Sequence, residues 1–181
     1  MALSTQKITT NAKTVVTTTA GVFTSAMLAN NHASSDVTID LYLTSQLGSD
    51  ITDTDTNVNF GSGYATTTNN QVIVVDNGGT AGTSDMFLQE RVYLSTGAFV
   101  GTCTTFTSAT SITFKEGIET ALTNDDSLYT GTRYYILNNV VIPNGSSLKL
   151  DGDEFSIDNN RYKMYILSNS STGNIDIITT S

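Results

Sequence analysis

Short runs in which apolar and polar residues alternate recur along this chain, and they limit its fold more than any other feature of the sequence. The clearest run is residues 37–43, where Val37, Ile39, Leu41 and Leu43 are separated by single, more polar residues. Successive side chains of a β-strand point to opposite faces, so a period of two predicts a strand with one buried and one exposed face. Such a strand is typical of an antiparallel sheet.

Other β-prone runs are separated by clusters of turn residues such as Asp76-Asn77-Gly78-Gly79 and Pro143-Asn144-Gly145-Ser146. We expect strands over residues 13–19, 22–28, 72–75, 91–94, 98–101, 112–114, 134–142, 148–150, 161–167 and 175–178. The strand over 134–142 is expected to be interrupted at Asn138-Asn139, and the last two strands are expected to form a terminal hairpin. Two short segments, 84–90 and 118–122, have a spacing that fits a single helical turn.

The composition supports an all-β fold. Charged residues make up 14% of the chain, against about 25% in an average soluble domain. Thr, Ser and Asn take their place. Thr is β-branched and suits a half-exposed sheet surface, and Asn, Asp, Ser and Gly favour turns. The chain is therefore predicted to consist of strands joined by many turns.

The spacing of these strands predicts an antiparallel β-sandwich of the immunoglobulin-like or jelly-roll type. We expect both terminal segments, 1–45 and 132–181, to form this sandwich together. Residues 46–131 would then be an inserted, smaller β-rich subdomain, since insertions are tolerated at polar loops. Its first part, Gln46 to about Asn59, is rich in Asp and is predicted to be a linker or long loop.

Charge and cysteine content limit the partners and the compartment. The chain has 17 acidic and 8 basic residues, a formal net charge of −9, which repels phosphate backbones and anionic lipids, so neither nucleic acid nor membrane is an expected partner. Its single cysteine, Cys103, cannot form an internal disulfide and is expected to be a small buried strand residue. Residues 1–7 lack a signal-peptide core, and no run reaches the about 20 apolar residues of a membrane span. We therefore expect synthesis in a cytoplasm.

The sequence offers little for catalysis. Nucleophilic catalysis by Ser or Cys commonly needs a histidine within reach, and the only one, His32, lies in a turn cluster rich in Asn and Ser. Zinc would need more Cys and His ligands than the chain has. A glycosidase needs two carboxylates at a defined separation. The candidate pairs lie beside turn residues and are expected to cap turns instead; they are Asp125 and Asp126, Glu116 and Glu119, and Asp151, Asp153 and Glu154. We expect no enzyme activity and assign no catalytic, cofactor or metal residue.

Two binding alternatives stay open. Asp50, Asp53, Asp55 and Asn57 offer closely spaced oxygens of the kind that Ca²⁺ prefers, although the spacing is not that of an EF-hand; the other interpretation is a solvated linker. An exposed cluster of Tyr129, Tyr134 and Tyr135 would indicate a receptor- or glycan-binding surface.

The terminal segments also carry a resemblance. The first contains Leu28-Ala29-Asn30-Asn31 and then Ser35-Asp36-Val37-Thr38-Ile39-Asp40-Leu41-Tyr42-Leu43, and the second contains Val141-Ile142-Pro143-Asn144-Gly145-Ser146-Ser147-Leu148 followed by Tyr162-Lys163-Met164-Tyr165-Ile166-Leu167. This pattern resembles small immunoglobulin-like virion proteins of tailed phages, particularly marine and cyanobacterial ones. It covers roughly the first 45 and the last 50 residues, and the middle looks like an insertion found in some members.

The resemblance implies a non-enzymatic structural protein of a virion, assembled in the host cytoplasm. Its position would be capsid decoration, head fibre, or a neck or tail accessory, and its partners would be other virion proteins. It also implies a homo-oligomer, often a trimer. The alternative function is a receptor- or glycan-binding module of a phage tail fibre.

Overall fold

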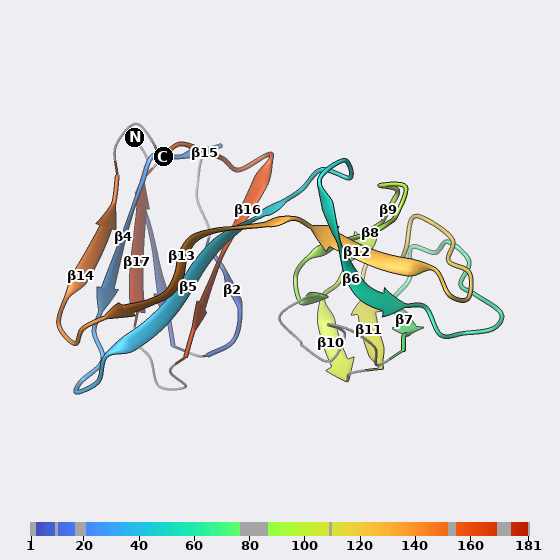
Figure 1. Ribbon diagram of the computed structural model, residues 1–181, viewed down its shortest axis with the longest axis horizontal. Coiled ribbons are helices and arrows are strands. Elements are labelled where there is room, and N and C mark those ends of the chain that lie inside the picture. The colour runs from blue at the N-terminus through green and yellow to red at the C-terminus, as the bar shows by residue number, and fades with distance from the viewer. Residues whose placement is uncertain are drawn as a thin grey trace. The chain divides into compact units, whose positions relative to one another are not determined.

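The computed structural model describes residues 3–9, 11–16, 21–76, 87–108, 110–151, 155–169 and 175–180 (Figure 1). The fold is all-β, as predicted. It divides into two compact units, residues 1–44 with 133–181 and residues 45–132. We call them the sandwich unit and the insert. The boundaries expected from sequence differ from these by one residue at each junction.

The sandwich unit contains two four-stranded sheets and a two-stranded one. The first sheet has the order β1 (Leu3–Ile8), β17 (Ile175–Thr180), β4 (Ser25–Asn30) and β14 (Ser147–Leu150). The second has the order β13 (Arg133–Ile142), β5 (Val37–Ser45), β16 (Tyr162–Ser168) and β2 (Thr14–Val15). The small third sheet pairs β3 (Val22–Phe23) with β15 (Ile157–Asp158).

One hydrophobic core holds the sandwich unit together. The first sheet contributes Leu28 and Ile177 and the second contributes Ile39, Leu41 and Met164, each at most 2% exposed. The alternation over residues 37–43 thus places its apolar side chains in the core, which confirms the prediction for this strand. Full burial of one such side chain contributes about 1.5–3 kcal/mol.

Strands of the sandwich unit pair at nearly mirror-image positions in the sequence. Leu3 lies opposite Thr180, Leu28 opposite Leu148, and Thr44 opposite Arg133, all in antiparallel pairs. β2 likewise pairs with β16. The unit is therefore one long antiparallel hairpin, folded over on itself to make two layers (Figure 1), and in the sequence the insert follows β5 and precedes β13.

One sequence expectation for the sandwich unit is wrong, and a second is confirmed only in part. β16 and β17 do not form a terminal hairpin, because they belong to different sheets; each buries one face, so the two pack across the core instead of edge to edge. The strand over 134–142 is continuous, but its pairing with β5 shifts between Leu137 and Val140, at the predicted Asn138-Asn139 interruption. The asparagines are taken up in bulges, with Asn139 at φ 54°, and β13 continues beyond them.

The insert is built from a four-stranded and a three-stranded sheet. The first has the order β6 (Ile51–Asn57), β12 (Ser127–Gly131), β8 (Arg91–Leu94) and β9 (Phe99–Thr102), and the second has the order β10 (Thr105–Ser108), β11 (Ser111–Phe114) and β7 (Gln71–Val74). Val58 pairs with Val75 where β6 meets β7, and β9 continues into β10 through Cys103, whose N–H bonds to the Glu90 carbonyl. These links arrange the strands as a ring of neighbours, like a small barrel around a second core.

The Asp-rich segment is not the linker predicted from its polarity. It forms β6, in which the buried Thr54 and Thr56 alternate with the exposed Asp53 and Asp55. A threonine can be buried in this way because its methyl group packs while its hydroxyl is satisfied: Thr54 Oγ1 donates to the Leu128 carbonyl at 2.6 Å.

The helical turn expected over 118–122 is also wrong. Ile118 and Leu122 are both buried, but each forms an isolated bridge, to Thr67 and to Tyr64 respectively. Ser84 and Met86, on which the other expected helical turn depended, lie outside the described residues, as do positions 17–19 of the strand expected over 13–19.

Candidate functional site

Three tyrosines lie in a row across the outer face of the second sheet of the sandwich unit. Tyr42 on β5 points away from the core because its neighbour Leu41 points into it. Its ring stacks on Tyr165 of β16 at a centroid distance of 5.6 Å and packs against the tilted ring of Tyr135 of β13 at 5.5 Å. We call these residues the tyrosine row. Tyr42 and Tyr165 are buried, whereas Tyr135 is 51% exposed.

Cationic side chains surround the tyrosine row. The Lys13 ammonium lies 4.3 Å from the Tyr165 ring centroid, although Lys13 is only 4% exposed. The Arg133 guanidinium lies 4.9 Å from the Tyr42 ring, and Lys163 lies 5.5 Å from Tyr165. Aromatic faces attract cations, and the attraction is stronger where water is excluded. The row is therefore an aromatic platform, with cations beside the Tyr42 and Tyr165 rings, that presents the ring of Tyr135.

A polar hollow of about 220 Å³ adjoins this platform on β5. Asp40 in the hollow accepts a hydrogen bond from the Asn139 N–H at 2.6 Å, and Asn169 Oδ1 accepts one from the Thr38 N–H at 3.1 Å. Asn11 also lines the hollow. Asp40 is two residues before Tyr42, a rise of about 7 Å along a strand, so amide and carboxylate groups lie close to the tyrosine row.

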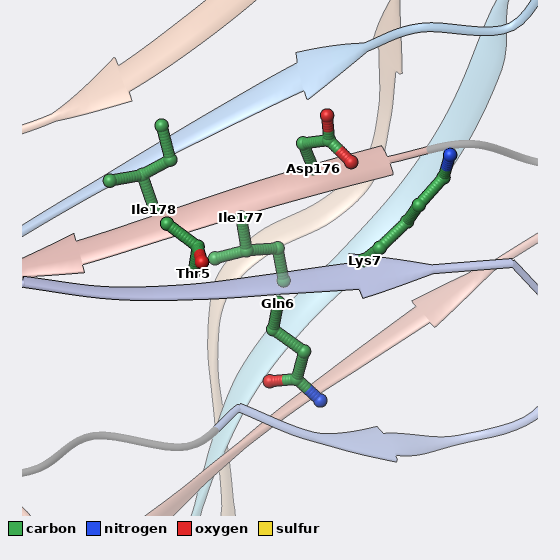
Figure 2. A pocket seen from close by; sticks show the side chains of 6 residues that line it. All are labelled: Thr5, Gln6, Lys7, Asp176, Ile177 and Ile178. Carbon is green, nitrogen blue, oxygen red and sulfur yellow. The ribbon is translucent and has the colours of Figure 1, made fainter.

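A second hollow, of about 350 Å³, lies over the β1–β17 ladder. Figure 2 shows Lys7, Asp176 and Ile178 projecting to one side of this ladder and Gln6 to the other. Lys7 lies directly opposite Asp176 in the register, and Asn31 Nδ2 donates to the Asp176 carboxylate. Opposite charges at facing positions stabilise a strand pair, so these groups have a structural role in the sheet.

The paired carboxylates chosen from the sequence mostly serve turns. Asp126 accepts a hydrogen bond from the Thr123 N–H at 2.6 Å, and Asp125 adopts a left-handed φ of 66°. Asp151 pairs with Lys149, and its predicted partners, Asp153 and Glu154, lie outside the described residues.

Glu116 and Glu119 are the pair that shares a surface hollow, which is also lined by Thr66, Thr67 and Thr68. Both glutamates are exposed. A wide, open hollow does not exclude the solvent that screens charges, so the arrangement resembles a polar surface more than a reaction centre.

His32 and Cys103 occupy the kinds of position predicted for them. His32 Nδ1 accepts hydrogen bonds from the backbone N–H groups of Ser34 and Ser35, at 3.2 and 2.9 Å, and so closes its own turn. Cys103 is completely buried in the core of the insert, although it lies between β9 and β10 and not within a strand. The two residues belong to different units.

Two of the four residues considered for calcium, Asp53 and Asn57, have side-chain partners within the protein. Asp53 Oδ1 accepts a hydrogen bond from the Asp55 N–H at 2.8 Å, and the Asp53 carboxylate is also hydrogen-bonded to Tyr129. Asn57 pairs with Asp76 at 3.2 Å. Over the described ranges, no group of three or more His, Cys, Asp or Glu side chains is placed to hold a metal ion.

The aromatic cluster expected from Tyr129, Tyr134 and Tyr135 is not a single surface. Tyr134 and Tyr135 are consecutive on β13 and point to opposite faces. Tyr134 packs edge-on against Tyr162, at 6.0 Å and 88°, whereas Tyr135 joins the tyrosine row. Tyr129 belongs to the insert. Sequence reasoning missed the row because its members come from three strands whose register is set only by folding.

Comparisons of this chain with protein-family models, with curated proteins and with solved structures found no match. Among the described residues, no helix is long and apolar enough to cross a membrane. Function is therefore argued from the residues and the fold.

Proposed function

We propose that this chain is a non-enzymatic structural protein of a tailed-phage virion that acts through contacts with other virion proteins. The observation that supports this proposal most is the mirror-image pairing of β1 with β17, β2 with β16, β4 with β14 and β5 with β13. A hairpin folded over in this way is the winding of a jelly roll, an architecture common in viral capsid and lectin domains. It supports the jelly-roll alternative over the immunoglobulin-like one, and the resemblance of the terminal segments supports the same function.

The distribution of charge supports different roles for the insert and the sandwich unit within this proposal. The insert carries ten acidic and two basic residues, a formal charge of −8, whereas the sandwich unit carries seven acidic and six basic residues, a formal charge of −1. A nearly neutral sandwich can pack against neighbouring subunits without strong repulsion. The acidic insert is repelled by packaged DNA and suits contact with a basic protein surface or with solvent.

The direct test is to look for the chain in the particle. Virions of the phage that encodes it are purified through two density gradients and analysed by quantitative mass spectrometry, followed by cryo-electron microscopy. We expect a fixed copy number per particle and density that fits the sandwich. Absence from purified virions that contain all other structural proteins would contradict the proposal.

The second candidate is a glycan-binding module, and the tyrosine row favours it. Tyr135 presents a half-exposed ring whose back is supported by Tyr42, and a sugar stacked on it would lie near Asp40 and Asn139 in the polar hollow. Stacking on an aromatic face combined with a few polar contacts is a common mode of ligand binding.

An array of bacterial surface polysaccharides tests this candidate. We expect Tyr135→Ala to abolish binding, while Tyr134→Ala, the neighbouring tyrosine on the opposite face, keeps it. Binding of no glycan by the wild-type chain, or an equal loss in both variants, would count against a glycan-binding role and leave the structural proposal unaffected.

A further inference from the structure

The two large sheets of the sandwich unit have four edge strands, and three of them are protected against pairing with another chain. An edge strand exposes unpaired backbone groups, and proteins commonly protect it by shortness, by bulges or by charge. β2 has only two residues, and β14 has four, including the exposed Lys149. β13 is long, but its register shifts twice and Asn139 takes a left-handed conformation.

The fourth edge strand, β1, also carries one exposed lysine, Lys7, but it is neither short nor bulged. Its six residues pair with β17 without a register shift, from Leu3 opposite Thr180 to Ile8 opposite Ile175. On its other side no strand of the described ranges pairs with it. Leu3 at its start is 65% exposed, the highest value among the large hydrophobic residues whose side chains the structure describes.

We propose that a second copy of this chain binds this edge, with β1 antiparallel to β1 of the second copy about a twofold axis. Residues that face each other in an antiparallel pair point to the same side of the sheet. Thr5 and Lys7 are exposed on the same outer face as Leu3, while Gln6 points inward and donates to the Val15 carbonyl at 2.8 Å. In a twofold pair that keeps outward-pointing residues opposite outward-pointing ones, one residue must therefore face its own copy across the axis.

Side-chain chemistry selects Thr5 as the centre of the pair. In this register Thr5 faces Thr5 of the second copy, and Lys7 faces Leu3 of the second copy, so that the alkyl stem of the lysine covers the exposed leucine. A centre at Lys7 would place two ammonium groups opposite each other, which is unfavourable. The result is an isologous dimer in which two four-stranded sheets become one continuous sheet.

A cysteine cross-link tests both the edge and the register. Facing residues of an antiparallel pair have Cα atoms about 4.5–5.5 Å apart, which falls within the disulfide range of about 4.4–6.8 Å. The natural cysteine, Cys103, is buried. We therefore expect Thr5→Cys to form a covalent dimer under mild oxidation on a non-reducing gel.

Leu3→Cys is the matched control on the same strand. In the proposed register the two copies of residue 3 are four positions apart along the sheet, a separation of more than about 13 Å, so this variant should stay uncross-linked under the same conditions. A Thr5→Cys chain that stays monomeric, or one that cross-links no better than Leu3→Cys, would overturn the proposal.

Light scattering provides an independent measurement without cysteines. We expect the wild-type chain and Thr5→Val to have the mass of a dimer, and Thr5→Lys, which places like charges across the axis, to be a monomer that keeps a cooperative thermal transition at a lower midpoint. A wild-type monomer at the highest soluble concentration, or a dimeric Thr5→Lys chain, would refute this interface. The proposal does not rest on a virion function, so the two can fail separately.

Discussion

At the scale of single residues, the contact between Tyr129 and Asp53 has a measurable consequence. The hydrogen bond to Asp53, together with desolvation and the negative charge of the carboxylate, raises the pKa of Tyr129 above its usual value of about 10. A raised pKa in the folded state means that the contact stabilises the fold fully below about pH 10 and that this contribution is lost as the pH rises through the folded-state pKa.

We predict that Asp53→Asn lowers the pKa of Tyr129 toward its usual value, because the substitution removes the negative charge beside the phenol. The measurement is a pH titration followed by NMR of the tyrosine ring carbons, with Tyr129→Phe used to assign the signal. An unchanged midpoint in Asp53→Asn would contradict the contact. The stability difference between wild type and Asp53→Asn should also shrink above pH 10.

A glycine in the insert is required by a close backbone approach. Gly117 has φ 85°, and a Cβ atom at this position would lie 1.9 Å from the carbonyl oxygen of Thr67. That carbonyl accepts the N–H of Ile118 at 2.8 Å. We predict that Gly117→Ala destabilises the insert by more than about 2 kcal/mol, since it combines backbone strain with a steric clash.

The control for Gly117 is Gly61→Ala, because nothing lies within 4 Å of a Cβ built at Gly61. Urea unfolding of both variants should show a clear loss of stability only for Gly117→Ala. Equal midpoints for the two variants would mean that the loop carrying Gly117 can move away from Thr67 at little cost.

At the scale of elements, β6 shows how threonine can replace an aliphatic residue in a strand. We predict that Thr54→Val destabilises the insert by about 1–2 kcal/mol, because the carbonyl of Leu128 loses its donor inside the protein. The same change at the exposed Thr52, whose hydroxyl donates to that of Thr132 on the surface, should be nearly neutral. Chemical denaturation measures both, and the reverse order of effects would refute this account.

Sequence patterns predicted most strands because alternation is a local signal, as in residues 37–43. They failed for β6 because threonine counts as polar in such a pattern, although Thr54 and Thr56 are completely buried. They failed for 118–122 because two bridge positions four residues apart have the same spacing as a helical face. The tyrosine row could not be predicted, since it requires the register of β5, β13 and β16.

At the scale of the whole molecule, the mirror-image pairing predicts that the sandwich unit folds without its insert. Thr44 and Arg133 face each other at the end of the β5–β13 pair, so an Asn-Gly turn can join them directly as a two-residue hairpin loop. We expect the chain lacking residues 45–132 to show a cooperative thermal transition and a β-type circular dichroism spectrum. Residues 45–132 alone serve as the companion sample, and a sandwich without a cooperative transition would contradict the division into units.

The two-part organisation could be predicted from the sequence because both junctions are polar and because the strand-and-turn pattern of the first 45 residues returns in the last 50. The order of strands within each sheet could not, because it depends on pairs such as Leu3 with Thr180 that are far apart in the sequence. No local pattern of residues specifies such a partner.

The insertion of residues 45–132 between β5 and β13 in the sequence has a consequence for folding kinetics. Non-local pairs form slowly because closing a long loop costs entropy, although each doubling of the loop adds only about 0.6 kcal/mol. If the insert folds first, it brings Thr44 and Arg133 together and shortens every other loop at once. Pairing can then proceed outward from β5 with β13. The sandwich closes only after β17 has been synthesised, so the edge of β1 that pairs with β17 stays exposed until then.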